Sequence, residues 1–178
     1  KYVSKHEIEK EIEAQLLKAF SSGLKITHIN GHNHIHIFPK VIDVVVKLVK
    51  KYKIKYIRLP YEKIIEKNKK IPIQIKIRNS ITKQLVKNKI IKNKLKTTHA
   101  FYGGLYLNNL DLQKLSLIFK SIKNETNELM VHPAYTDKNG DLFHQSKQRE
   151  NEISLLTNKN LKQLIKKTKI KLTDFSQI

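Results

Sequence analysis

The sequence has 178 residues, enough for one domain with a hydrophobic core, since domains typically span about 100 to 200 residues. It contains no cysteine, which excludes disulfides and thiolate metal sites and fits a reducing compartment, so we expect a cytoplasmic protein. Apolar runs such as residues 44–46 are far shorter than the ~20 residues that cross a bilayer, so no membrane span is expected. Because the chain starts with Lys1 and its only methionine is Met130, we expect residues to be missing before Lys1.

The formal net charge is +21, from 36 lysines and arginines against 15 acidic residues. Such an excess favours nucleic acid as a partner, because lysine and arginine neutralise phosphates. However, only Arg58, Arg78 and Arg149 are arginines, and no aromatic residue interleaves with the densest lysine run, residues 83–96, to stack on bases. We therefore interpret the charge as a solvated basic surface, and a nucleic-acid-binding module is a less favoured hypothesis.

Helical and extended patterns alternate in the first half of the chain. Ser4 and Glu7 form a capping box before apolar residues at helical spacing, and Gly23 is suited to end that helix. Pro39 suits the first turn of a second helix. The sequence predicts, in chain order, a helix over 4–23, a strand over 25–29, a helix over 39–52, a strand over 54–59, a loop excursion over 61–77 and a basic helix over 79–93.

The alternation continues in the second half, where Asn108 and Asn109 are suited to cap a helix. The sequence predicts, in chain order, a strand over 94–98, a helix over 110–119, a strand over 129–131, an irregular stretch around 137–140, helices over 149–156 and 157–167, and a strand over 170–175. Strands separated by helices imply βαβ units and a parallel sheet, so the predicted fold class is α/β. We expect residues 1–178 to form a single domain.

Four histidines, His28, His32, His34 and His36, lie where the first predicted strand meets the second predicted helix. Imidazole is the commonest protein ligand of metals, so this run indicates a site built around a divalent ion, with at least one of the four as a ligand. In the alternative interpretation, one or two bind the ion and the others orient the ligands or pack in the core. Those at alternating positions would face one way if the strand continued.

Further chemically active residues follow other predicted strands. Arg58, His99 and His132 fall at or just after the carboxyl ends of three of them. In a (β/α) barrel the site forms at this edge, so residues that are far apart in the sequence would converge there.

Residues 27–39, Thr-His-Ile-Asn-Gly-His-Asn-His-Ile-His-Ile-Phe-Pro, resemble the histidine-rich segment of the YdjC-like carbohydrate deacetylases, the family that includes chitooligosaccharide deacetylase. Four further segments agree in order, and the match spans nearly the whole chain. They are residues 56–60, 99–103, 127–134 and 149–156. The histidine-rich motif and the Glu-Leu-Met-x-His-Pro motif within 127–134 are specific in combination.

The resemblance implies an irregular (β/α) barrel and a metal-dependent hydrolase that removes acetyl groups from N-acetylated sugars or oligosaccharides and releases acetate. In that family the metal, usually magnesium, is held by an N-terminal aspartate, an N-terminal histidine and the histidine that corresponds here to His32. The other two ligands have no counterpart in this chain, because about the first third of the family's length is absent. We therefore expect a barrel that is incomplete at the N-terminus and a fragment that is inactive alone. Imidazole also suits Zn²⁺, which is the alternative to Mg²⁺.

With a sugar as substrate, residues at the other strand ends acquire candidate roles. His132 is the candidate catalytic residue, as the acid for the leaving amine or as a group that stabilises the tetrahedral oxyanion; alternatively, it is a histidine capped against the Pro133 turn. His99 and Tyr102 are candidates for a wall that stacks against a pyranose ring, or for an aromatic cluster that closes the barrel. Arg58 binds substrate in one interpretation and pairs with a carboxylate in the other.

The chain departs from the family pattern at Asn30, Asn33 and Ala134, where the family commonly has Asp, His and Gly. The loss of groups that orient a metal ligand weakens metal binding by roughly 10-fold or more. An inactive remnant or pseudoenzyme is the main alternative to the deacetylase, and it is favoured if no N-terminal extension supplies the other ligands, because one histidine cannot hold a catalytic ion. A homodimer is also compatible with the sequence.

Overall fold

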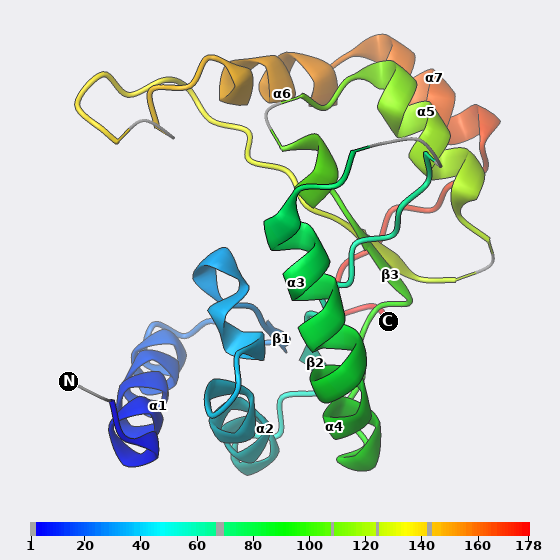
Figure 1. The fold of residues 1–178 in the computed structure, drawn as a ribbon. Helices are drawn as coiled ribbons and strands as arrows, with labels where there is room; N and C mark the ends of the chain where they lie inside the picture. The colour runs from blue at the N-terminus through cyan, green and yellow to red at the C-terminus, as the bar shows by residue number, and fades with distance from the viewer. Residues whose placement is uncertain (1–2, 67–69, 108, 124, 142–143) are drawn as a thin grey trace. The chain divides into compact units, whose positions relative to one another are not determined.

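A computed structural model of the chain describes residues 3–66, 70–107, 109–123, 125–141 and 144–178 (Figure 1). The chain divides into two compact units, and helix α3 (Ile73–Ile81) contributes to both. The first unit comprises Lys1–Tyr61, Lys76–Thr98 and Asp174–Ile178, and the second comprises Glu62–Ile75 and His99–Thr173.

The first unit begins with two neighbouring helices, α1 (Lys5–Ser21) and α2 (Val41–Lys51), as Figure 1 shows. The predicted capping box opens α1, because the Ser4 hydroxyl accepts a hydrogen bond from the Glu7 N–H and the Glu7 carboxylate accepts one from the Ser4 N–H. Pro39 lies two residues before α2 rather than in its first turn. Both predicted helices are confirmed, with slightly shorter bounds.

Short parallel strands connect these helices to the rest of the first unit. β1 (His28–Ile29) pairs in parallel with β2 (Tyr56–Ile57), and Tyr56 also forms a parallel bridge with Lys96. The first two predicted strands are therefore confirmed in place, although the paired part of each is short. The strand that was expected after the basic helix is reduced here to the single bridge at Lys96.

The predicted basic helix starts earlier than expected. It consists of α3, a π-helical turn η2 (Thr82–Val86) and α4 (Lys87–Lys92). Pro72 precedes α3 and its carbonyl accepts the Ile75 N–H, so the proline acts as a helix start inside what was expected to be a loop. That part of the loop prediction is wrong.

The core of the first unit lies between α1, α2, α4 and the strands. α2 buries most of its length because its valines, leucine and isoleucine cover more than one face. The buried core residues are Leu16, Ile37, Ile42, Val44, Val45, Val46, Leu48, Val49, Ile54, Ile57, Leu59, Val86 and Ile90.

The second unit also contains a parallel pair, β3 (Ala100–Tyr102) with β4 (Asn127–Leu129), and Glu62 forms a parallel bridge with Phe101. β3 lies later in the sequence than the predicted strand 94–98, because its three side chains are all buried whereas lysines in 94–98 are exposed. β4 lies two residues earlier than predicted. The short parallel strands in both units confirm the α/β class.

Helices of the second unit pack beside this pair, with α5 and α7 in contact. They are η3 (Gly104–Tyr106), α5 (Leu112–Ser121), α6 (Gln148–Leu156) and α7 (Lys159–Lys167). The last three confirm the predicted helices. The cap of α5 is Asp111, whose carboxylate accepts the Lys114 N–H; of the expected cap pair, Asn108 lies outside the described residues. The buried core residues are Ala100, Tyr102, Tyr106, Leu110, Leu115, Ile118, Phe119 and Leu161.

The strand that was predicted over residues 170–175 is wrong, since this fully described segment contains no strand. The hydrogen bonds of Ile170 and Asp174 are local: the Ile170 N–H bonds to the Ile165 carbonyl at the end of α7, and Asp174 accepts the Ser176 N–H. The alternating apolar residues of 170–175 therefore lie after the end of α7 and in a turn around Asp174, not in a strand.

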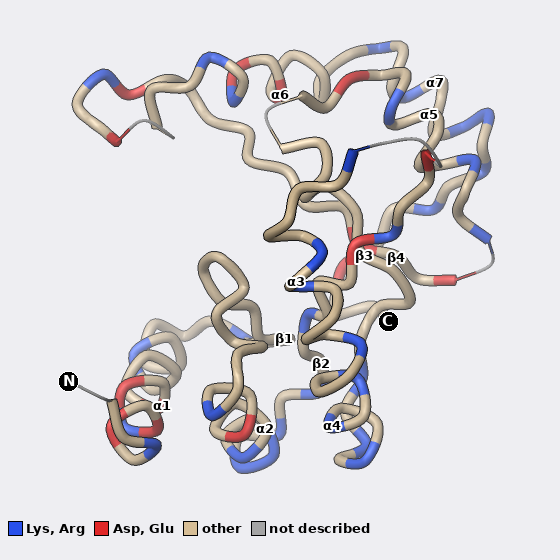
Figure 2. Tube along the Cα trace, viewed as in Figure 1, with Lys and Arg blue, Asp and Glu red and all other residues tan. Residues whose placement is uncertain are grey.

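Lysines lie on helices of both units, as the blue segments of Figure 2 show, and do not gather on a single element. This distribution agrees with the interpretation of a solvated basic surface. Among the helices of the described residues, none combines the length and the apolarity that crossing a bilayer requires.

Candidate functional site

The histidine-rich segment does not continue β1 as a strand. It forms a turn of 3₁₀ helix, η1 (His32–Ile37), in which Asn33 (φ 49°) and His34 (φ 58°) adopt left-handed backbone conformations. Asparagine tolerates this conformation better than most residues. The turn exposes His32 and Asn33 and buries His34 and His36. The four histidines therefore have different environments, contrary to the alternation that a continued strand would give.

His36 connects this turn to the end of β2. Its Nδ1 accepts the Gly31 N–H at 3.0 Å, and its Nε2 donates to the Arg58 carbonyl at 3.0 Å. Burial lowers the pKa of His36 from 6.5 to about 4, since only 2% of the residue is exposed. Both ring nitrogens are occupied, so His36 stabilises the turn and is not a metal ligand in this conformation.

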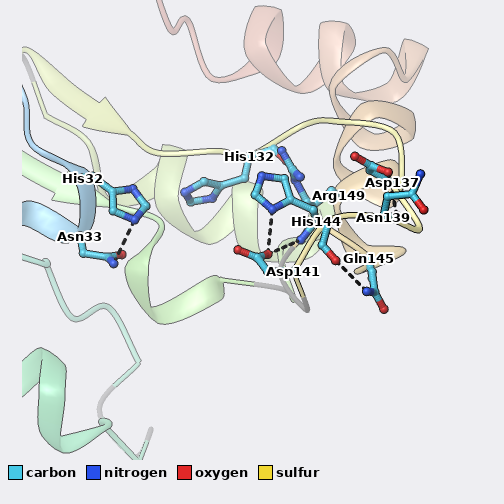
Figure 3. A network of polar contacts seen from close by, with 10 residues as sticks. His32, Asn33, His132, Asp137, Asn139, Asp141, His144, Gln145 and Arg149 are labelled. Carbon is cyan, nitrogen blue, oxygen red and sulfur yellow. Dashed lines mark hydrogen bonds and ion pairs between the residues drawn. The ribbon is translucent and has the colours of Figure 1, made fainter.

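His32 is the exposed histidine at the carboxyl end of β1. Its Nε2 lies 3.1 Å from the Asn33 Nδ2, and Figure 3 shows the amide beside the ring. Among the residues that the structure describes, no three His, Asp or Glu side chains gather closely enough to hold a metal ion. The described donors therefore do not form a complete metal site by themselves. The imidazole of His32 is exposed, and its role as a metal ligand stays a prediction.

His28 and His34 have contacts that suit packing. The His28 ring stacks on Phe175, with 3.9 Å between ring centroids, and its Nδ1 lies 3.0 Å from the Thr27 hydroxyl. The His34 ring is buried and lies edge-on to His36, with 6.1 Å between ring centroids. Both arrangements agree with the interpretation in which some of the histidines are part of the core.

Arg58 follows β2 at its carboxyl end. Its N–H donates to the Ile29 carbonyl at 3.0 Å, and its own carbonyl accepts the His36 imidazole. The backbone of Arg58 thereby joins β1, β2 and the histidine-rich turn, while its side chain is half-buried. Within the first unit, the structure thus brings the predicted residues His32 and Arg58 to the same edge of the β1–β2 pair.

His132 follows β4 in the second unit, and helix α6 holds its backbone. The His132 N–H donates to the Glu152 carboxylate at 2.5 Å, and its carbonyl accepts the Arg149 Nε at 3.3 Å. Glu150 accepts both the N–H and the hydroxyl of Thr136, at 2.9 and 2.7 Å, and these bonds lower its pKa. Acidic and basic residues of α6 therefore fix residues 132–136 at the carboxyl end of β4.

His99 and Tyr102 lie differently from the expectation for a sugar-binding wall. Because β3 starts at Ala100, His99 precedes the strand and lies at its amino end, where its Nε2 is 2.9 Å from the Glu125 carboxylate. Tyr102 is fully buried, and its hydroxyl lies 3.1 Å from the Ser121 hydroxyl. The structure favours core packing for Tyr102 and a surface contact with Glu125 for His99, and their roles in substrate binding stay predictions.

Glu62 is an organising residue that sequence reasoning missed. Its carboxylate is 1% exposed and accepts the N–H groups of Gly103, Gly104 and Leu105 at 3.0, 2.9 and 3.2 Å. Gly103 has φ 117°, and a Cβ there would lie 2.3 Å from the Met130 carbonyl oxygen. The Gly-Gly pair directly after a strand is the one local signal of this tight turn.

A second missed group lies in the loop between residues 137 and 145 (Figure 3). The His144 Nδ1 lies 2.7 Å from the Asp141 carboxylate, the Gln145 amide donates to the Gly140 carbonyl at 2.7 Å, and the Asn139 N–H donates to Asp137 at 2.9 Å. These bonds are local and connect residues that are close in the sequence.

The chain matches a protein-family model described as YdjC-like protein over residues 1–167. It is 34% identical over 173 residues to a carbohydrate deacetylase of Thermoanaerobacter pseudethanolicus, covering 96% of this chain and 59% of that protein. It is 32% identical over 177 residues to a carbohydrate deacetylase of Brevibacillus brevis, covering 97% and 61%. It is 28% identical over 174 residues to a chitooligosaccharide deacetylase of Yersinia enterocolitica, covering 96% and 60%. The chain therefore spans about three fifths of the length of these relatives.

The fold is also similar to that of a solved structure. A proposed cellobiose-phosphate cleavage protein of Enterococcus faecalis V583 superposes with a TM-score of 0.72 and 20% sequence identity, covering 98% of this chain and 61% of the other. At this identity the likeness concerns the fold, which agrees with the α/β arrangement described above.

Proposed function

Because the chain belongs to the YdjC-like protein family, we propose that it contributes to a metal-dependent hydrolase that removes acetyl groups from N-acetylated sugars or oligosaccharides. The names of the relatives support this reaction, since two of them are carbohydrate deacetylases and one is a chitooligosaccharide deacetylase. The parallel strands of both units are consistent with an irregular (β/α) barrel as the complete fold.

The observation that carries the proposal is the exposed imidazole of His32 beside the Asn33 amide, at the carboxyl end of β1. His32 is the residue of this chain that would bind the divalent ion, Mg²⁺ by resemblance or Zn²⁺ by the chemistry of imidazole. When bound, such an ion polarises an amide carbonyl and lowers the pKa of water. No three His, Asp or Glu side chains among the described residues gather closely enough to hold the ion, so we propose that further ligands complete the site.

The chemistry assigns a second role to His132. Hydrolysis of an N-acetyl group adds water to the amide carbonyl, breaks the C–N bond and gives acetate and a free amine, so the leaving nitrogen must receive a proton. A half-buried imidazole on a backbone fixed by Glu152 and Arg149 is suited to deliver that proton or to stabilise the tetrahedral oxyanion. Arg58, at the end of β2, is proposed to contact the sugar.

The experiment that tests this function is the release of acetate from N,N′-diacetylchitobiose by the full-length gene product. The protein is first treated with a chelator and then supplied with Mg²⁺ or Zn²⁺. We expect acetate release that disappears with the chelator and returns with one of the metals. This 178-residue chain, assayed alongside, is expected to be inactive, since it contributes one imidazole to the metal site.

An inactive remnant of the family is the second candidate. It is favoured by the finding that no three His, Asp or Glu side chains among the described residues gather closely enough to hold a metal ion. This hypothesis predicts no acetate release from any N-acetylated sugar by the full-length gene product, with either metal. The two candidates therefore differ in one measurable product.

A further inference from the structure

Tyr135 has the most exposed large apolar side chain in the described part of the molecule, with 79% of the residue accessible to solvent. It lies three residues after His132, beyond the carboxyl end of β4, on the edge where parallel α/β proteins bind their ligands. The other tyrosines of this unit, Tyr102 and Tyr106, are fully buried. An aromatic ring that is left in water at this edge has no packing role within its own unit.

The backbone on both sides of Tyr135 is fixed by helix α6. The Ala134 N–H donates to the Arg149 carbonyl at 3.4 Å, and Thr136 donates from its N–H and its hydroxyl to the Glu150 carboxylate. An exposed aromatic residue on a fixed backbone loses little conformational freedom when a ligand binds, because its side chain has two rotatable bonds.

Two residues of the segment that follows, Asp137 and Gly140, lie close to His144. The Asp137 N–H donates to the His144 carbonyl at 3.0 Å, and Gly140 approaches the same histidine so closely that a Cβ would lie 2.4 Å from the His144 Cβ. Asp137 and Lys138, two and three residues after Tyr135 in the sequence, are exposed polar residues of the same segment. An apolar ring that is flanked by polar groups matches a ligand with one apolar face and a polar rim.

We propose that Tyr135 forms a sugar-binding platform, in which its ring packs against the C–H face of a pyranose unit of the substrate. This inference rests on the proposed function and adds a substrate-binding residue to it. Pyranose rings present axial C–H groups on their faces and hydroxyls at their rim, so an aromatic face with polar neighbours complements them. Tyr135 thereby takes the stacking role that the sequence assigned to buried Tyr102.

The test measures the binding of N,N′-diacetylchitobiose to the full-length gene product by calorimetry, and the steady-state constants of acetate release. Tyr135→Ala is expected to weaken binding and to raise KM by about tenfold, with kcat within about twofold of the wild-type value. Tyr135→Phe keeps the ring and is expected to bind within about twofold of wild type. Leu172→Ala is the matched control, since Leu172 is also exposed, at 70%, in the same unit.

The outcomes separate this inference from the proposed function. Sugar binding without acetate release would refute the deacetylase. In that case the affinity of the Tyr135→Ala variant for N,N′-diacetylchitobiose would still decide whether the ring binds sugar. Acetate release with an unchanged KM and affinity in Tyr135→Ala would overturn the platform alone. Absence of any sugar binding by the wild-type protein would overturn both, and equal losses in Leu172→Ala would show that the effect is not specific to Tyr135.

Discussion

The Nε2 of His36 lies 3.0 Å from the carbonyl oxygen of Arg58, so a buried side chain of the histidine-rich turn is bonded to the carboxyl end of β2. The same ring accepts the Gly31 N–H through Nδ1. These two bonds hold the left-handed turn from which His32 projects. The turn therefore depends on a buried histidine whose two ring nitrogens both bond to backbone groups.

Replacing His36 with leucine is expected to lower the free energy of unfolding of this chain by about 2 to 4 kcal/mol. The substitution leaves the Gly31 N–H and the Arg58 carbonyl without their partner, and each such loss in a buried place costs roughly 1 to 3 kcal/mol. Urea unfolding monitored by circular dichroism measures the change. His6→Ala is the control, because His6 is exposed on α1 and is expected to change the stability by less than about 0.5 kcal/mol. Equal losses in the two variants would contradict this account of His36.

His36 also makes stability depend on pH. Burial lowers its folded-state pKa to about 4, whereas its ordinary value is 6.5, so between these values the unfolded chain binds the proton and the folded chain does not. Above pH 6.5 His36 is neutral in both states and does not lower the free energy of unfolding. As the pH falls from 6.5 towards 4, the free energy of unfolding decreases by about 3 kcal/mol because of this residue. Urea unfolding at a series of pH values is expected to show this decline, and the slope is expected to be shallower in His36→Leu. A slope that is unchanged in this variant would assign the decline to other groups.

Part of the fold follows from local signals in the sequence. The capping box of Ser4 and Glu7 predicts α1 correctly, because both of its bonds form within four residues. Strand positions are less accessible to such reasoning: β3 lies at Ala100–Tyr102 because these residues are buried together, and burial depends on the whole unit. The predicted strand near Ile170 fails for a different reason, since the Ile170 N–H forms a local bond to the Ile165 carbonyl at the end of α7.

Glu62→Ala is expected to destabilise the chain by about 3 kcal/mol or more. Three N–H groups after β3 would lose their common acceptor, a carboxylate that is itself 1% exposed, and the Gly103 N–H would lose its partner in a buried place. Urea unfolding measures the loss. Glu11→Ala is the matched control, because Glu11 is exposed on α1 and its side chain bonds only locally, to Gln15. An effect below about 1 kcal/mol for Glu62→Ala would show that the turn does not depend on the carboxylate.

Two glycines with positive φ are expected to differ in their tolerance of alanine. A Cβ on Gly103 would lie 2.3 Å from the Met130 carbonyl oxygen, so Gly103→Ala must displace backbone between β3 and β4 and is expected to cost about 3 kcal/mol or more. Gly23 has no atom within 4 Å of such a Cβ, so Gly23→Ala bears only the left-handed strain, about 1 kcal/mol. Melting temperatures of the two variants provide the comparison, and a smaller loss for Gly103→Ala would contradict the clash.

Only part of the candidate site could be predicted from the sequence. The position of His32 and Arg58 at one edge was predictable, because both follow neighbouring parallel strands. The different environments of His32 and His36 could not be predicted, because these environments arise from the left-handed backbone of Asn33 and His34. The roles of Glu62 and Glu152 could not be predicted from the sequence, because their partners are backbone N–H groups that are distant in the sequence.

The central claim, a deacetylase in which His32 is a metal ligand, is tested most directly by acetate release from N,N′-diacetylchitobiose by the full-length gene product and its His32→Ala variant. The account predicts that the variant loses roughly a hundredfold or more of the activity, whereas Asn33→Ala loses about tenfold. The exposed His6→Ala variant is expected to retain the wild-type rate. Full activity in His32→Ala would contradict the assignment of the metal ligand. No acetate release by the wild-type protein with either metal would contradict the deacetylase itself.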